Sequence, residues 1–228
     1  MEATSVGETI TLKAADGHQF SAYKVTPKGK PKGAIVVIQE IFGVNRHIRG
    51  LTDGFAADGY LAIAPGIYDR AQPGVELGYT EADVVTGREL RTKISWDAII
   101  QDVQAAVDAV KSAGKVGITG YCFGGSVVWL AAERVKGLSA AVGYYGGAIA
   151  QFADAKIKVP TILHFGAKDP MIPPGDIDKV RKNHPNLPIY VYDADHGFVC
   201  DERHHYDAAA SKQARERTMA FFAKHLAG

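Results

Sequence analysis

The chain has 228 residues, of which 46% are hydrophobic and 22% are charged. This length favours one domain over two, and we expect residues 1–228 to form a single domain with a large core. The composition is that of a soluble globular protein, which argues against a disordered or collagen-like chain. The formal net charge of +1 gives no electrostatic reason to expect a nucleic-acid or membrane partner.

Cysteine content and apolar runs bear on metals and on location. The two cysteines, Cys122 and Cys200, are too few for a disulfide framework, and no paired Cys/His spacing resembles a zinc ligand set, so we expect no metal. Residues 1–13 lack the apolar run of a secretory signal, and nowhere do about 18 apolar residues run together as a membrane span requires. The expected location is therefore a reducing cytoplasm, with both thiols free.

The chain is expected to begin with two antiparallel strands. Residues 9–14 and 19–26 alternate between apolar and polar side chains, and Asp16-Gly17 between them favours a hairpin turn. The segment 27–33, rich in Lys, Pro and Gly, is predicted to be a solvated loop.

From residue 34 onward, buried strands alternate with helices. The continuous β-branched run at 34–38 is typical of a strand that is covered on both faces. Similar strands are predicted at 60–64, 115–119, 140–144, 161–165 and 189–192, and helices at 46–58, 99–112, 125–135, 176–184 and 206–226. This alternation predicts an α/β protein with a mostly parallel sheet. The irregular segment 68–85 has the length of a lid or binding loop.

One strand runs directly into the sequence Gly120-Tyr121-Cys122-Phe123-Gly124, and a helical segment follows at once. This is the pattern of a nucleophile elbow, with Cys122 in the position where serine is usual. The flanking glycines lack Cβ and permit a sharp strand-to-helix turn, and the helix N-terminus favours a thiolate. The alternative is a core cysteine flanked by glycines, without a chemical role.

Two later strand ends supply the residue types that such a nucleophile needs. Asp169 follows the strand at 161–165, and His196 follows the strand at 189–192, in the chain order nucleophile, acid, base. The carboxyl ends of parallel strands meet at one edge of the sheet, so these side chains can meet there. Asp195 is adjacent to His196 and is poorly placed to orient its ring.

The other histidines are expected to have no chemical role. His18, His47, His184 and His225 are placed in turns or helices without matched partners, and His204 and His205 at the start of the last helix.

These motifs resemble those of the dienelactone hydrolase family, the carboxymethylenebutenolidases of the α/β-hydrolase fold. The resemblance spans nearly the whole chain and rests on Gln39-Glu40-Ile41-Phe42-Gly43-Val44-Asn45, the Cys122 elbow, Tyr144-Tyr145-Gly146, the Asp169 turn and His196-Gly197-Phe198. It implies an α/β-hydrolase fold, with helices on both faces of a mostly parallel sheet and an N-terminal antiparallel hairpin. It also implies a catalytic triad of Cys122, Asp169 and His196.

The resemblance implies roles for residues near the thiol as well. Glu40 belongs to the family pattern, and a carboxylate there takes the proton of Cys122 or holds the resting thiol in orientation. The alternative for Glu40 is an exposed loop carboxylate. The backbone N–H groups of Ile41 and Phe123 are expected to form the oxyanion hole.

Family members that act on carboxylate-bearing lactones bind the acid group with arginines, whose forked donors match a carboxylate. Arg203 is the first candidate, and the second is Arg88 or Arg91, which the sequence does not decide. The best-known family pattern has an arginine four residues after the catalytic histidine, where this chain has Cys200. This departure does not affect the interpretation as a hydrolase, but it argues against the lactone on which the best-known family members act. Cys200 itself is expected to have no partner.

Aromatic side chains are candidates for an apolar pocket around the acyl group, with core packing as the alternative for each. They are Phe42, Tyr68, Tyr79, Trp96, Tyr145 and Phe198, of which Tyr145 is placed among the substrate-binding residues.

The expected activity is that of a cysteine-dependent carboxylic ester hydrolase, which acts on an activated ester or unsaturated lactone through a thioester and needs no cofactor. If Glu40 takes the thiol proton, little general acid remains for a poor leaving group, which favours enol-lactones over amides. A general carboxylesterase and a non-catalytic ligand-binding relative are the alternatives. A cysteine amidotransferase fits less well, because Phe198 stands where that class has Glu, and no second cysteine near Cys122 in sequence supports a dithiol cycle. The expected partner is a small molecule, and the expected state a monomer or dimer.

Overall fold

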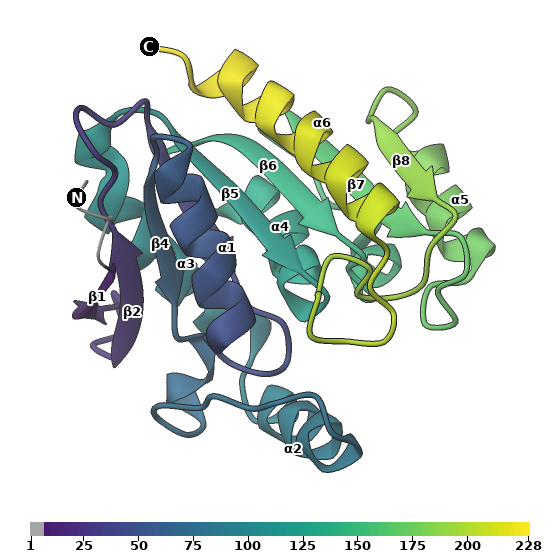
Figure 1. The fold of residues 1–228 in the computed structure, drawn as a ribbon, viewed down its shortest axis with the longest axis horizontal. Coiled ribbons are helices and arrows are strands. Elements are labelled where there is room, and N and C mark those ends of the chain that lie inside the picture. Colours follow the sequence, from purple (N-terminus) through teal and green to yellow (C-terminus); the bar gives the residue numbers. More distant parts are fainter. Residues whose placement is uncertain (1–6) are drawn as a thin grey trace.

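The computed structural model describes residues 7–228, and one eight-stranded sheet runs through them in the order β1-β2-β4-β3-β5-β6-β7-β8 (Figure 1). The strands are β1 (Gly7–Lys13), β2 (Gln19–Val25), β3 (Ala34–Ile38), β4 (Leu61–Pro65), β5 (Val116–Tyr121), β6 (Leu138–Tyr144), β7 (Thr161–Gly166) and β8 (Ile189–Tyr192). β1 pairs antiparallel with β2, β2 pairs antiparallel with β4, and the other pairs are parallel. The predicted mostly parallel sheet with an N-terminal hairpin is confirmed. Residues 1–6, part of the segment considered for a secretory signal, lie outside the described residues.

Helices cover both faces of the sheet. In Figure 1, α1 (Arg46–Ala57) and α6 (Ala208–Leu226) lie in front of it, and α3 (Trp96–Val110) and α4 (Phe123–Arg134) lie behind. Side chains of β3 alternate between the two cores: Ile35 and Val37 pack with α1 and α6, whereas Val36 and Ile38 pack with α3 and α4. This explains the continuous apolar run of that strand.

Side-chain caps determine where several helices begin. Ser95 accepts a hydrogen bond from the backbone of Ala98, so α3 begins at Trp96, three residues before the predicted start. The same type of cap at Asp207 begins α6 at Ala208. The prediction that His204 and His205 lie in this helix is therefore wrong, because both precede the cap. The helix α5 (Pro174–Asn183) packs beside the short 3-10 turn η3 (Ile149–Phe152).

The largest departure from the predicted elements is the helix α2 (Glu81–Thr92), which occupies part of the segment predicted to be irregular. Its first turn has a capping box, in which Thr80 and Asp83 each bond the other's backbone. Only Gly87 and Leu90 of this helix are buried, so its sequence lacks the apolar stripe that identifies a packed helix. α2 lies beyond the carboxyl ends of the parallel strands, at the lower side of Figure 1.

Within residues 7–228, no helix combines the length and the apolar character that a membrane crossing requires.

Candidate active site

Cys122 occupies a tight turn between β5 and α4. Its backbone has φ 55° and ψ −118°, in the left-handed half of conformational space. Close packing requires glycine on both sides: a Cβ at Gly120 would lie 2.3 Å from the carbonyl oxygen of Gly124, and a Cβ at Gly124 would lie 2.4 Å from that of Ile38. The predicted strand-to-helix turn is therefore present, and it leaves Cys122 half-buried.

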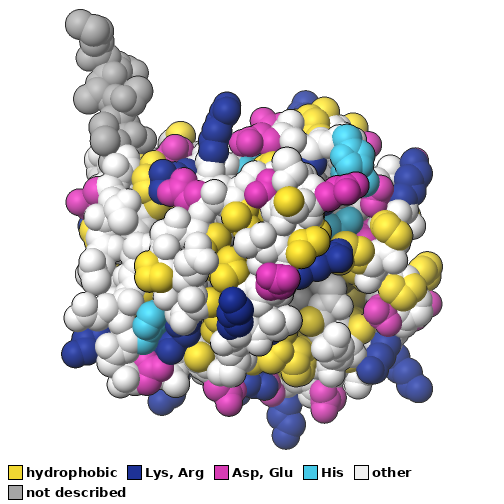
Figure 2. Space-filling model, turned by 90° about the horizontal axis from the view of Figure 1, so that it is seen from below, with side chains coloured by type: hydrophobic (Ala, Val, Ile, Leu, Met, Phe, Trp, Pro, Cys, Tyr) yellow, Lys and Arg dark blue, Asp and Glu magenta, His cyan; other side chains and the backbone are white. Residues whose placement is uncertain are grey.

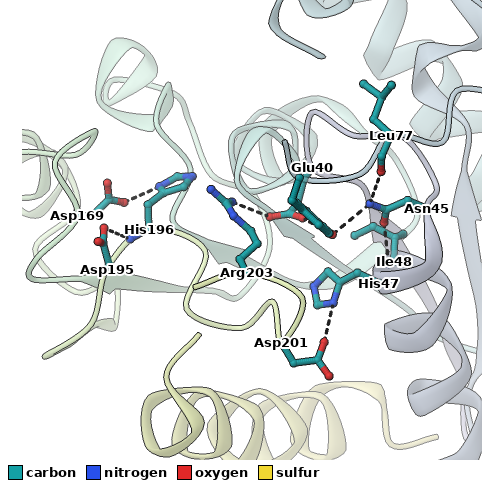
Figure 3. A network of polar contacts seen from close by, with 11 residues as sticks. Glu40, Asn45, His47, Ile48, Leu77, Asp169, Asp195, His196, Asp201 and Arg203 are labelled. Carbon is teal, nitrogen blue, oxygen red and sulfur yellow. Dashed lines mark hydrogen bonds and ion pairs between the residues drawn. The ribbon is translucent and has the colours of Figure 1, made fainter. Parts of the chain in front are cut away.

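Asp169 and His196 come together at the same edge of the sheet. His196 Nδ1 and Asp169 Oδ2 are 2.6 Å apart, and both side chains are buried (Figure 3). Asp169 is fixed in turn by the backbone N–H of Met171, which donates to its Oδ1 at 2.8 Å. Asp195 instead accepts from the backbone N–H of His196 and pairs with His205. Asp169 thus contacts the ring of His196, whereas Asp195 contacts its backbone.

The charge state of His196 results from opposing effects. Burial lowers the pKa of this imidazole, but the negative charge of the Cys122 thiolate and the hydrogen bond to Asp169 raise it, with a net pKa of about 10. Its second ring nitrogen, Nε2, is buried and has no hydrogen-bond partner among residues 7–228. These surroundings favour the imidazolium form of His196.

Cys122 and His196 both line a pocket of about 220 Å³. The other lining residues include Ile41, Phe42, Val84, Arg88, Arg91, Trp96, Phe123, Met171 and Arg203. Figure 2 views the molecule from this side, where hydrophobic side chains are interspersed with basic and acidic ones. Two of the predicted aromatic residues, Phe42 and Trp96, line the pocket. Val84 and Met171 were not predicted, and the capping box of α2 was the available signal for Val84.

Tyr145, which was assigned to substrate binding, is not among the residues that line this pocket. This residue directly follows β6 and has a positive φ of 37°. Its side chain is completely buried in the core. Its ring contacts those of His196 and Phe198, with centroid separations of 5.1 and 5.3 Å. Tyr68, Tyr79 and Phe198 are likewise not among the residues that line the pocket.

The arginines of the pocket differ in how they are held. Arg91 is half-buried, lies with its guanidinium 3.9 Å from the centroid of the Trp96 ring and donates to the carbonyl of Ile94 at 2.6 Å. Arg88 is exposed. On the other side of the pocket, the side chain of Arg203 is 16% exposed. Arg91 and Arg203 are thus fixed in position, whereas Arg88 lies at the rim.

Glu40 is completely buried just after β3, so the alternative of an exposed loop carboxylate is wrong. Its Oε1 lies 3.7 Å from Nη1 of Arg203, and the hydroxyl of Tyr79 donates to its Oε2 at 3.3 Å. Figure 3 shows this carboxylate facing Arg203.

The expectation that Cys200 has no partner is also wrong. Cys200 is fully buried, and its sulfur and the nearest polar atoms of Glu40 and His47 lie within 4.8 Å of one another. Burial and the nearby charge of Glu40 raise the pKa of the Cys200 thiol to about 12. His47 has a further neighbour, because its Nδ1 lies 3.8 Å from Asp201. Cys200 is far from Glu40 and His47 in sequence, so only the fold reveals the cluster.

A second histidine that was expected to lack a partner also has one, since His184 Nε2 bonds the carbonyl of Ala153 at 2.8 Å.

The loop that carries Ile41 packs against α2. At Gly87 a Cβ would lie only 2.2 Å from the carbonyl oxygen of Ile41, so the helix and the loop touch through bare backbone. Tyr68 stabilises this contact, because its hydroxyl donates to the carbonyl of Gly87 at 2.9 Å. The position of the Ile41 loop thus depends on α2.

The mixed sheet, the helices on both of its faces and the sharp turn between β5 and α4 define the protein as an α/β-hydrolase-fold protein. The sequence profile described as the dienelactone hydrolase family matches residues 20–226, and the chain belongs to this family. It is therefore a hydrolase, and the family and fold predicted from the sequence are confirmed.

Individual relatives agree with this assignment. Carboxymethylenebutenolidases from Pseudomonas putida and Pseudomonas knackmussii are each 33% identical over 227 residues, which cover 95% of this chain and 96% of theirs. A crystal structure from Klebsiella pneumoniae, described as that of a candidate dienelactone hydrolase, superposes with a TM-score of 0.87 at 30% identity and covers 97% of this chain and 100% of that one. A Pyrococcus furiosus esterase, at 15% identity and a TM-score of 0.74 over 97% of this chain and 93% of its own, shares the fold.

Proposed function

We propose that the chain is a cysteine-dependent hydrolase that opens an unsaturated lactone, or cleaves an activated ester, whose substrate carries a carboxylate. Cys122 is the nucleophile, His196 the base and Asp169 the group that orients it. The observation that carries this proposal is the shared pocket, which Cys122 and His196 line together with Arg91 and Arg203.

Acylation begins with attack of the Cys122 thiolate on the carbonyl carbon of the substrate. The backbone N–H groups of Ile41 and Phe123 are assigned to the oxyanion that develops on the carbonyl oxygen. Collapse of the tetrahedral intermediate breaks the bond to the ester oxygen and leaves the acyl group on sulfur as a thioester. In a lactone, the leaving oxygen stays attached to the same molecule.

The charge state of His196 favours one kind of leaving group. With a pKa of about 10, its imidazolium is a weak acid at neutral pH and protonates a poor leaving group slowly. An enol-lactone releases an enolate, and an activated ester a stabilised oxyanion, so both need little help from an acid. Amides and unactivated alkyl esters are poorer substrates on this argument.

Deacylation uses the same histidine in its neutral form. Once Cys122 is acylated, its negative charge is gone, and burial then lowers the pKa of His196. The neutral imidazole, oriented by Asp169, takes a proton from the water that attacks the thioester. We propose that Glu40 acts on the thiol of Cys122, by accepting its proton or by holding the resting thiol in orientation. Oε1 of Glu40 lies 3.7 Å from Arg203.

Arg91 and Arg203 are the proposed carboxylate-binding residues. Each guanidinium is held by its surroundings, and a positioned guanidinium donates two hydrogen bonds to a carboxylate with little loss of freedom. Arg88 lines the same pocket but is exposed, so we assign it a smaller contribution.

The pocket also favours a second candidate function, that of a general carboxylesterase. Phe42, Val84, Trp96 and Met171 give it a largely apolar wall, which suits a neutral acyl group as well. Turnover of simple esters without turnover of carboxylate-bearing lactones would identify this activity.

The test is hydrolysis of cis- and trans-dienelactone and of p-nitrophenyl acetate at neutral pH by the wild type, Cys122→Ala and Cys122→Ser. We expect wild-type turnover of a dienelactone, and a loss of at least about 10³-fold in Cys122→Ala, because the covalent route is then closed. Cys122→Ser keeps a hydroxyl nucleophile, so its loss should be smaller. Ester turnover alone would replace the substrate assignment. No turnover of any of these compounds would favour the ligand-binding alternative, and dienelactone turnover retained by Cys122→Ala would exclude the thioester.

A further inference from the structure

Three side chains of types that can ligate a metal lie close together. Glu40 follows β3, His47 lies in the first turn of α1, and Cys200 lies in the loop before α6. One ligand atom from each lies within 4.8 Å of the other two, and all three residues are buried. Cys122, the proposed nucleophile, does not belong to this group.

Two polar atoms of the group have no hydrogen-bond partner within the described part of the chain. They are Oε1 of Glu40, on a fully buried residue, and Nε2 of His47, on a residue that is 7% exposed. Buried polar atoms are nearly always paired. Oε1 of Glu40 has the guanidinium of Arg203 at 3.7 Å, so the indication of a missing ligand comes from Nε2 of His47. Figure 3 shows the His47 ring between Asp201 and Glu40, with Nδ1 directed to Asp201.

We propose that Glu40, His47 and Cys200 bind a zinc ion, with Nε2 as the ligand atom of the imidazole and water in the fourth position. A thiolate, an imidazole and a carboxylate are the ligand types that zinc takes in proteins. Binding forms a zinc–sulfur bond and releases the proton of the Cys200 thiol to solvent.

The geometry needs only small adjustments. Zinc bonds of about 2.0–2.3 Å in a tetrahedron place ligand atoms roughly 3.3–3.8 Å apart. The present separations are at most 4.8 Å, so each side chain moves by less than about 1 Å. Asp201, 3.8 Å from Nδ1 of His47, is placed to fix the ring from behind, as carboxylates commonly do for metal-bound histidines.

The cluster has a route to solvent through His47. This residue borders a cleft of about 910 Å³ on the side of α1 and α6, and Asp201 lies on the same wall. The pocket of Cys122 and His196 is a different one. A metal ion can therefore reach the cluster without passing the proposed substrate site.

One nearby charge opposes the metal. The guanidinium of Arg203 lies 3.7 Å from Oε1 of Glu40 and competes with a cation for this carboxylate. Substitution of Arg203 by Gln should therefore tighten metal binding. If Glu40 has its proposed catalytic role, metal binding would also lower activity, but the test below measures binding alone and does not depend on the proposed function.

The test is titration of tag-free, chelator-treated protein with cobalt(II), whose sulfur-to-metal charge-transfer absorption reports a thiolate ligand. We expect Cys122→Ser to bind cobalt with this absorption, and Cys200→Ala to lack it. His47→Gln should weaken binding by at least about tenfold, whereas His204→Gln, at an exposed histidine in the loop that carries Cys200, should not. Zinc should displace the cobalt and raise the thermal unfolding midpoint of Cys122→Ser.

Three results would overturn the proposal. They are absence of the absorption in Cys122→Ser, its presence in Cys200→Ala, which would place the metal at Cys122, and unchanged affinity in His47→Gln. Circular dichroism of each variant shows whether it folds. His47 lies at the edge of the cluster, where it borders the cleft. The variant His47→Gln therefore tests the ligand set even if Cys200→Ala does not fold.

Discussion

At His196, burial and charge act in opposite directions on one imidazole. The ring is 4% exposed, which alone would keep it neutral, yet the thiolate of Cys122 and the hydrogen bond to Asp169 raise its pKa to about 10. Acylation or substitution of Cys122 removes the thiolate charge, which is one of the effects that raise this pKa. The effect of burial, which lowers the pKa, then weighs more. The proposed change of His196 from imidazolium to base within one catalytic cycle follows from this.

The first prediction concerns that balance. Substitution Cys122→Ser removes the negative charge that raises the pKa of His196, so the imidazolium should lose its proton at a lower pH than in the wild type. In the wild type it should persist up to about pH 10. Nuclear magnetic resonance of the labelled ring, followed as a function of pH, measures both midpoints. Equal midpoints would show that the thiolate does not control this group.

The second prediction concerns the proposed carboxylate site. Arg91→Gln keeps part of the side chain that packs on Trp96 but removes the charge, and a hydrogen bond between charged groups contributes about 1.5–3 kcal/mol. We expect kcat/KM for a dienelactone to fall by roughly 10- to 100-fold, and that for p-nitrophenyl acetate by less than about threefold. Arg88→Gln, at the exposed rim, is the matched control. An equal loss on both substrates would argue against a role in carboxylate recognition.

At the scale of elements, α2 and the loop after β3 form one unit. Gly87 lets the helix backbone approach the carbonyl of Ile41, and Tyr68 fixes the same turn of helix. The Ile41 N–H, assigned to the oxyanion hole, is therefore positioned by a helix that contributes few side chains to the core.

The third prediction tests this contact. In Gly87→Ala the new methyl would lie 2.2 Å from the Ile41 carbonyl oxygen, so the loop must shift. We expect kcat to fall by about 10- to 100-fold, because misplacement of such a group by about 1 Å costs that much. Gly50→Ala, in α1, has nothing within 4 Å of its new methyl and is the control, with kcat unchanged. A Gly87→Ala enzyme with wild-type kcat would separate α2 from the oxyanion hole.

The elements also show what the sequence can and cannot predict. The strands at 34–38 and 189–192 were predicted with their observed limits, because a glycine or proline precedes each strand and a polar residue follows it. The meeting of Asp169 and His196 followed from their places after two parallel strands. α2 was missed because its core contacts are confined to Gly87 and Leu90. The cluster around Cys200 depends on tertiary packing alone, and no local pattern marks it.

At the scale of the whole molecule, Arg70 connects three distant parts of the chain. It donates two hydrogen bonds of 2.7 Å to Asp102 of α3 and two, of 2.8 and 3.2 Å, to Asp16 in the turn between β1 and β2. The side chain of Asp102 is fully buried, so its charge depends on this guanidinium. The hairpin is thereby attached to the helix layer behind the sheet.

The fourth prediction follows from that burial. Arg70→Gln leaves the Asp102 carboxylate without its cation, and breaking a buried pair in this way costs about 3–5 kcal/mol of unfolding free energy. Arg134→Gln, which removes a guanidinium paired with the exposed Asp97, should change it by less than about 0.5 kcal/mol. Urea unfolding measures both. Similar stabilities for the two variants would show that the Arg70 network contributes little.

The central claim is that Cys122 carries the acyl group during hydrolysis. The most direct measurement is rapid acid quench of the wild-type enzyme during turnover of p-nitrophenyl acetate, followed by mass spectrometry of its peptides. We expect one acetyl group on the peptide that contains Cys122, appearing and decaying at rates that match turnover. Hydrolysis at the same rate with no acyl group on Cys122 would exclude the thioester.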